Sequence, residues 1–261
     1  MKKLIVANWK CNPATLRQAQ ELFRATIKAV PKSKNVKVVV CPPSVYLSGF
    51  RFSAKGGSAF GGQVSGLKLG AQDVFWEDTG AYTGAVGPRM LKSVGVTYVV
   101  MGHSERREQF GDTNESVRKK VAAALKGGLC VIVCVGEKTR EADASEYALY
   151  VKKEVEEALR GISKAALKNV VVAYEPLWAI GSDEADTPES TLEMALYIRK
   201  IIAGMFGNVV AQSFPVLYGG SVNIGNARAF LRDGGVDGLL VGRASLDSKA
   251  FGKIVEEANG L

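Results

Sequence analysis

The sequence predicts an α/β fold, a closed (β/α)8 barrel of eight parallel strands with outer helices. Short apolar runs rich in β-branched residues recur eight times along the chain. Helical patterns lie between most of these runs, and the alternation continues to the end with no linker or low-complexity segment. Units of about 30 residues suit a strand followed by a helix. We therefore expect a single domain over residues 1–261.

An open, doubly wound sheet is the alternative arrangement of the same elements. Such sheets usually carry the glycine pattern G-x-G-x-x-G in their first strand-to-helix turn. That pattern occurs nowhere in the sequence, and neither does the phosphate-loop pattern G-x-x-x-x-G-K-[S/T]. The closed barrel is therefore favoured.

The predicted strands are apolar along most of their length, as is typical of strands buried on both faces of a parallel sheet. In chain order they span residues 4–9, 36–41, 69–74, 98–102, 129–135, 170–174, 216–218 and 238–241.

Apolar residues at helical spacing predict helices between the strands. They span residues 14–30, 113–126, 144–160, a segment that begins near Thr187, and 249–258. Gly127 is placed to end the second helix. Thr187 is expected to cap the fourth, with Pro188 at its first position.

The charge of the chain is basic but dispersed. There are 34 Lys and Arg against 26 Asp and Glu, which gives a net charge of +8 at pH 7. A basic surplus suits anionic partners, but the tightest cluster, VRKKV at 117–121, is predicted to be an exposed helix face. We therefore expect no nucleic-acid partner.

The N-terminal sequence and the cysteines bear on location. The apolar run LIVANW is too short for a signal peptide or a membrane span. The four cysteines lie mostly within apolar runs, which favours reduced thiols over disulfides. We expect a cytoplasmic protein that does not bind membranes.

Polar side chains follow several of the predicted strands, at the end of a barrel where active sites lie. Lys10 follows the first strand, His103 the fourth and Glu175 the sixth. Each residue alone has a structural explanation. Lys10 fits an ion pair at the rim, His103 a hydrogen-bonded structural histidine, and Glu175 a helix cap. Together, with glycine turns at 219–220 and 242, they favour a functional site.

These groups indicate one type of chemistry. Glycine turns after the last two strands commonly bind phosphate through backbone N–H groups. A carboxylate, a neutral imidazole and an ammonium beside a phosphate suggest proton abstraction next to a carbonyl group. The carboxylate takes the proton, and the other two groups stabilise the enediolate. No metal ion or organic cofactor is required.

The segment AYEPLWAIGS at 173–182 makes a family resemblance plain. With NWKCN, GHSERR, VCVGE and YGGSV, it closely resembles the triosephosphate isomerase family, in order and along the whole chain. The resemblance implies a TIM barrel, a homodimer, and a glycolytic enzyme that interconverts glyceraldehyde 3-phosphate and dihydroxyacetone phosphate.

The resemblance also implies roles for individual residues. Glu175 would be the base that carries the proton between two carbons, and His103 a neutral electrophile at the substrate oxygens. Lys10 would supply positive charge, with Asn8 and Asn12 orienting that region. The groups expected to bind phosphate through backbone N–H are Gly181, Ser221, Gly242 and Arg243.

A lid is expected from Pro176 to about Asp186, closing over the substrate to exclude water. Trp178 and Glu137 would hold the open lid. The residues expected to clamp the base are Ile180 and Leu240, and those expected to receive the closed lid are Tyr218 and Ser221.

The sequence departs from the family at two places. The lid tip reads GSDEAD at 181–186 instead of GTGKTA, which adds acidic residues. In the loop around Thr83, which would enter a partner subunit, the usual Glu is Ala85 and a usual Ser is Gly87. Arg106 would thereby lose one carboxylate partner across the dimer interface.

Two rival hypotheses are weaker. A barrel glycosidase would use Glu137 and Glu175 as paired carboxylates, but it would leave Lys10, His103 and the glycine turns without a function. A catalytically silent barrel that binds nucleic acid would need a basic stripe with interleaved aromatic residues. The sequence has no such stripe.

Overall fold

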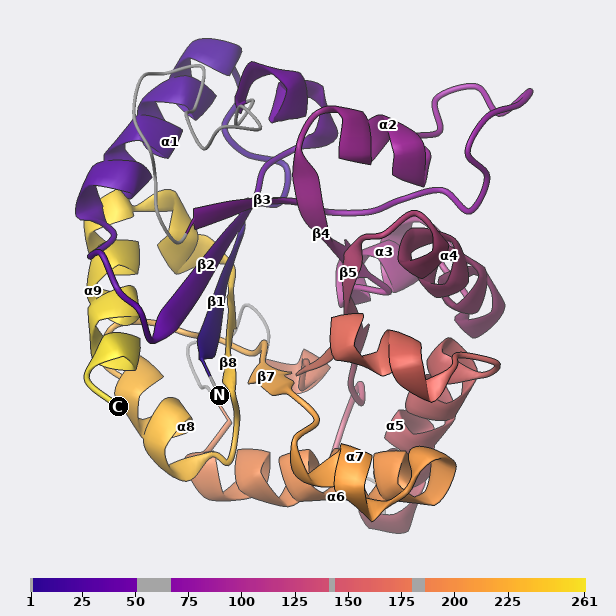
Figure 1. Cartoon of the computed structure of the whole chain (residues 1–261). Coiled ribbons are helices and arrows are strands. Elements are labelled where there is room, and N and C mark those ends of the chain that lie inside the picture. The colour runs from indigo at the N-terminus through magenta and orange to yellow at the C-terminus, as the bar shows by residue number, and fades with distance from the viewer. Residues whose placement is uncertain (1, 51–66, 141–143, 180–185) are drawn as a thin grey trace.

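The structure is a computed structural model that describes residues 2–50, 67–140, 144–179 and 186–261. Within these residues, eight strands form a closed barrel in chain order, and every neighbouring pair is parallel. The helices surround the strands as an outer ring (Figure 1). The predicted (β/α)8 barrel is therefore confirmed.

The strands lie where the apolar runs predict them. They are β1 (Lys3–Asn8), β2 (Val36–Cys41), β3 (Leu67–Ala71), β4 (Val96–Met101), β5 (Cys130–Val135), β6 (Val170–Tyr174), β7 (Val216–Tyr218) and β8 (Gly238–Val241). The predicted third strand, 69–74, was placed too late in the sequence. After Ala71 the chain leaves the ladder, and the Gln72 side chain instead donates hydrogen bonds to the Lys10 and Cys41 carbonyls.

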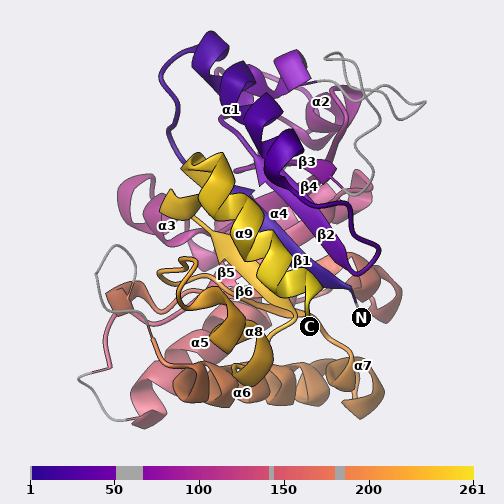
Figure 2. The same cartoon turned by 90° about the vertical axis from the view of Figure 1, so that its left-hand side faces the viewer.

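The long helices also match the prediction. They are α1 (Leu16–Ala29), α4 (Asn114–Lys126), α5 (Ala144–Leu159), α6 (Pro188–Phe206) and α9 (Ser248–Asn259). The Thr187 hydroxyl accepts the Ser190 N–H at the start of α6. Gly127 caps the end of α4. In Figure 2, α9 crosses in front of β1, packed between α1 and α8.

Several short elements were not predicted. They are the helices α2 (Pro88–Ser93), α3 (Ser104–Gln109), α7 (Asn208–Gln212) and α8 (Ala227–Asp233), and the 3-10 segments Ser44–Phe50, Lys164–Asn169, Leu177–Ala179 and Arg243–Leu246. None of them has more than seven residues, so the sequence cannot show a repeat at helical spacing.

The core has two layers because successive strand residues face opposite sides. In β1, Leu4 and Val6 belong to a cluster formed by strand residues alone, which fills the barrel. Ile5 and Ala7 belong to a larger cluster that includes the helices. A filled interior leaves the rim at the carboxyl ends of the strands as the place for a site. Among the described helices, none is long and apolar enough to cross a membrane.

Candidate active site

Lys10 follows β1 in a left-handed backbone conformation, with φ of 52°. Such a conformation costs a non-glycine residue about 1–3 kcal/mol, and surrounding contacts must hold it. The Asn8 side chain accepts the Lys10 N–H at 3.1 Å, and the Gln72 amide binds the Lys10 carbonyl at 2.9 Å. The Lys10 ammonium lies 2.6 Å from Glu105. These contacts fix a half-exposed cation at the rim.

Asn12 lies on the surface of the same loop, where its side-chain amide donates to the Trp9 carbonyl at 3.3 Å. Asn8 is buried. The two asparagines therefore hold the backbone on either side of Lys10.

His103 is buried at the start of α3, as its N-terminal cap. Its Nδ1 accepts the backbone N–H of Glu105 at 3.2 Å. A protonated imidazole has hydrogen on both nitrogens and cannot accept, so this contact favours the neutral ring with hydrogen on Nε2. The Nε2 atom lies 3.3 Å from Oε1 of Glu175.

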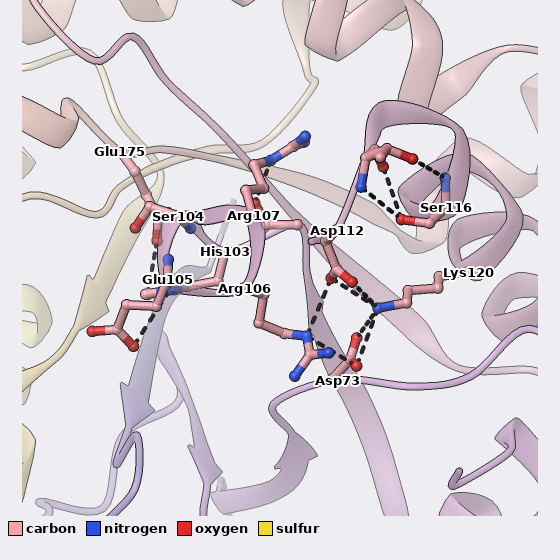
Figure 3. A network of polar contacts seen from close by, with 12 residues as sticks. Asp73, His103, Ser104, Glu105, Arg106, Arg107, Asp112, Ser116, Lys120 and Glu175 are labelled. Atoms are coloured by element: carbon pink, nitrogen blue, oxygen red, sulfur yellow. Dashed lines mark hydrogen bonds and ion pairs between the residues drawn. The ribbon is translucent and has the colours of Figure 1, made fainter. Parts of the chain in front are cut away.

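Glu175 follows β6 and is almost fully buried. Its Oε2 accepts the Ser104 N–H at 3.1 Å, a contact drawn in Figure 3. Its Oε1 faces the imidazole and has no well-aligned hydrogen bond among the described residues, and the buried Cys134 thiol also interacts with the carboxylate. The carboxylate is therefore retracted against the start of α3 and only partly satisfied.

The turns after β7 and β8 complete the rim. A Cβ at Gly219 would lie 2.9 Å from Cγ of Glu175, so only glycine leaves room for the carboxylate there. A Cβ at Gly242 would lie 3.4 Å from Cε of Lys10. Arg243 follows with its side chain exposed to solvent. Both glycine turns thus lie beside residues of the predicted site.

Glu137 forms a separate cluster beside Trp178, near the start of the predicted lid. Its Oε1 accepts hydrogen bonds from Arg140 Nε at 2.8 Å, the Tyr174 hydroxyl at 2.8 Å and Trp178 Nε1 at 3.0 Å. Beside it, the Ser221 hydroxyl donates to the Ala179 carbonyl at 2.8 Å. Glu137 and Trp178 therefore contact each other as expected.

Asp186 lies at the far end of the lid, where its backbone N–H donates to the Tyr218 hydroxyl at 3.2 Å. Its carboxylate is buried, accepts the Thr191 hydroxyl at 3.2 Å and lies 3.9 Å from Arg140. Asp186 was expected to add to the acidic charge of the predicted lid tip, but its carboxylate is buried and hydrogen-bonded, so this expectation was wrong. Residues 180–185, including Ile180 and Gly181, lie outside the described residues. Leu240 is buried in the barrel layer of the core.

Thr83 is exposed in the segment between β3 and α2, which extends beyond the ring of helices (Figure 1). Next to this segment is a hollow of about 740 Å³. Its lining reaches the catalytic candidates and includes Asn8, Lys10, His103, Glu105, Arg106 and Phe110.

Arg106 lines this hollow but is paired within its own chain. Its Nε lies 3.0 Å from Asp73 and 3.1 Å from Asp112. Lys120 binds the same two carboxylates at 2.8–3.1 Å, as Figure 3 shows. Asp73 and Asp112 therefore pair Arg106 within its own chain, whereas the expected loss of a carboxylate partner across a dimer interface at Ala85 stays a prediction.

Sequence reasoning missed two other polar partners. Glu105 binds Lys10, and Arg140 organises the Glu137 cluster. Glu105 lies in the GHSERR motif, and Arg140 lies three residues after Glu137 in the sequence. Both residues can be found in the sequence, but the side chains with which they pair cannot.

The chain was compared with known protein families. The model of the family described as Triosephosphate isomerase matches residues 3–258. The match covers nearly the whole chain of 261 residues, and it includes every residue of the rim described above. The chain belongs to the triosephosphate isomerase family, and it is an isomerase that interconverts glyceraldehyde 3-phosphate and dihydroxyacetone phosphate.

Proposed function

We propose that Glu175, His103, Lys10 and Asn8 carry out this isomerisation at the rim. The Glu175 carboxylate removes a proton from the carbon next to the carbonyl group and returns it to the neighbouring carbon. His103 donates a hydrogen bond from Nε2 to the enediolate oxygens, while Lys10 stabilises their negative charge. Asn8 holds Lys10 in place. These steps need no metal ion or organic cofactor.

The observation that carries this assignment is the contact between the two central groups. The imidazole accepts a backbone N–H at Nδ1, which directs its one hydrogen toward Glu175, 3.3 Å away. A donor and a base that face the same space can act on adjacent substrate atoms.

The substrate phosphate is assigned to the backbone N–H groups of Ser221, Gly242 and Arg243, together with Gly181. The proximity of Gly242 to the Lys10 side chain supports this assignment. The exposed Arg243 side chain adds positive charge on that side. The proposed ligand is therefore the phosphate dianion of a triose phosphate.

We also propose that residues 176–186 act as the lid. Glu175 directly precedes the lid, so lid movement would carry the base forward from its retracted position. Tyr218 and Ser221 hold the two described ends of this segment, at Asp186 and Ala179. The Trp178–Glu137 hydrogen bond is present together with these two contacts. The proposed clamp of Ile180 and Leu240 would close over the base.

A homodimer fits the surface next to the site. The exposed segment around Thr83 projects from the surface, and the hollow beside Lys10 is open. In the proposed dimer, the segment of one subunit enters the hollow of the other. Tyr82 and Phe110 add exposed aromatic surface near both. We expect Thr83 to reach the partner's site, so a separated monomer should be nearly inactive. Sedimentation and specific activity measured over the same dilution series test this, and a fully active monomer would contradict it.

The proposed location is the cytoplasm, with the reaction serving glycolysis and, in reverse, gluconeogenesis. Four free cysteines, two of them buried, support a reducing compartment. We infer one domain over residues 1–261.

A coupled assay with glyceraldehyde 3-phosphate tests the catalytic assignment. Glu175→Gln keeps the size of the side chain and removes the base, so kcat should fall by about 10²–10⁴-fold. Glu137→Gln is the matched control, because Glu137 is a buried glutamate after the neighbouring strand. The assignment fails if the Glu175 variant keeps most of its activity.

A further inference from the structure

A second buried carboxyl group, Glu154, lies behind the proposed base. It belongs to α5, and only 2% of its side chain is exposed. Its Oε2 accepts the Gly136 N–H at 2.9 Å, and its Oε1 lies 3.3 Å from Nη1 of Arg107. The proposed reaction assigns it no part. A buried carboxyl group is costly unless it is hydrogen-bonded or paired, so its immediate surroundings determine its charge.

Arg107 is fixed in place by other contacts. It leaves α3 in the direction opposite to Arg106 (Figure 3). Its Nε donates to the Gly102 carbonyl at 2.7 Å, and its Nη1 donates to the Asn114 side chain at 2.7 Å. Its Nη2 is buried and has no hydrogen-bond partner among the described residues. A rigid cation with one unused donor group therefore lies beside Glu154.

Gly136 contacts both Glu154 and the backbone of the proposed base, Glu175. A Cβ at Gly136 would lie 1.7 Å from the Glu175 carbonyl oxygen, so the two backbones are in direct contact. The Glu175 N–H also donates to the Val135 carbonyl at 2.8 Å. A shift of Gly136 would consequently displace Glu175, and the hydrogen bond to Glu154 restrains that shift.

A small cavity of about 10 Å³ connects the same groups. It is roughly large enough for one water molecule. Its lining includes Ser104, Arg107, Cys134, Gly136, Glu154 and Glu175. The guanidinium and both carboxyl groups therefore border one small space, and because all three side chains are largely buried, their charges are screened less than charges at the surface.

The charge of Glu154 changes close to neutral pH. Burial raises the pKa of Glu154 to about 7; Arg107 opposes this rise, and the charge of Glu175 adds to it. Burial also raises the pKa of the neighbouring Cys134 thiol well above its usual range, so that group stays uncharged. The other titratable or charged groups around this space are Tyr150, Glu108 and Lys138.

We propose that Glu154 is a positioning residue for the base: it fixes the Gly136 backbone behind Glu175 and, with Arg107, determines the charge that the retracted carboxylate faces. This proposal rests on the proposed role of Glu175. When Glu154 is ionised, it balances the charge of Arg107. When Glu154 is protonated, the unbalanced guanidinium attracts the Glu175 carboxylate and holds it in its retracted position.

The test compares Glu154→Gln with the parent enzyme at two pH values. Glutamine keeps an acceptor for Gly136 but never ionises. We expect kcat to fall about tenfold near pH 8 and by less than about twofold near pH 6, with KM within about twofold at both. The matched control is Glu156→Gln, an exposed glutamate of the same helix, which should change neither value. Equal losses at both pH values, or no loss at either, would overturn the proposal.

A second variant covers the case in which Glu154→Gln does not fold. The Tyr150 hydroxyl hydrogen-bonds to Glu154 and lowers its pKa. Tyr150→Phe should therefore move the rise of kcat to higher pH while leaving its upper limit unchanged. An unchanged pH midpoint would contradict the proposal. Failure of the catalytic assignment itself would be visible separately, as activity in the parent enzyme that does not depend on Glu175.

Discussion

Glu137 and Glu175 are both buried, and both follow neighbouring strands of the barrel, yet their surroundings differ. Glu137 accepts three hydrogen bonds at one oxygen, one of them from the Arg140 guanidinium. Glu175 accepts one backbone N–H and otherwise faces a neutral imidazole and the Cys134 thiol. Among the described residues it forms no ion pair with a lysine or arginine. A carboxylate bound by a cation and several donors is a poor proton acceptor, whereas a carboxylate without a bound cation is available for proton transfer.

The paired-carboxylate enzyme was a rival hypothesis because both residues are glutamates at strand ends. Only the motifs of the family resemblance distinguish the two residues in the sequence. The structure gives them different partners, so they are not two equivalent catalytic groups. The predictions below test this distinction, beginning with the largest expected effect.

Glu175→Asp should have the largest effect, because it withdraws the carboxylate from the substrate by one methylene group. A misplacement of about 1 Å can cost on the order of 10²-fold. We expect the loss in kcat, with KM little changed, in the coupled isomerase assay. Glu137→Asp should cost less than about tenfold. Similar losses in the two variants would remove the distinction between the two carboxylates.

Arg140→Met should reduce stability more than activity. It removes the cation from Glu137 while its apolar chain can still pack near Tyr147 and Trp178. Leaving the buried carboxylate with only neutral donors should lower the free energy of unfolding by about 1–3 kcal/mol. Urea unfolding measures this loss. Arg160→Met is the control, because Arg160 is exposed and pairs only at the surface; it should change stability by less than about 0.5 kcal/mol. Equal losses of unfolding free energy in the two variants would show that the Arg140–Glu137 ion pair stabilises the fold no more than a surface ion pair does.

The acidic lid tip should have the smallest effect. Asp186 is excluded from it because its carboxylate is buried and bound. Asp183 and Glu184 remain, and each would repel a phosphate at about 8 Å by roughly 0.5–1 kcal/mol. The double variant Asp183→Gly, Glu184→Lys should lower KM a few-fold at low salt, with the gain shrinking as salt rises. An equal gain at every salt concentration would exclude electrostatic repulsion as the cause.

The fold could be predicted almost entirely from the sequence, because burial on both faces gives each strand a continuous apolar run. The short helix α3 could not be predicted, because its N-terminal cap is His103, and histidine is not one of the residue types that usually cap a helix. Its position matters because α3 supplies the Ser104 N–H that holds Glu175 and the Glu105 N–H that fixes the imidazole.

The site residues could be predicted from the strand ends and from the family resemblance, but the pairs that their side chains form could not. Arg106 pairs with Asp73, which lies 33 residues away in the sequence. Arg107 and Glu154 likewise come from separate helices, and no local pattern joins them. Contacts of this kind depend on how helices pack around the barrel.

The protonation of His103 is the most direct test of the account, because the proposed mechanism needs a neutral ring with hydrogen on Nε2. It is the only histidine, so nitrogen-15 NMR of the labelled enzyme gives one imidazole signal pair without assignment. We predict an unprotonated Nδ1 and a protonated Nε2 at the pH of the activity assay, because Nδ1 accepts the Glu105 N–H. Hydrogen on Nδ1, or on both nitrogens, would contradict the account.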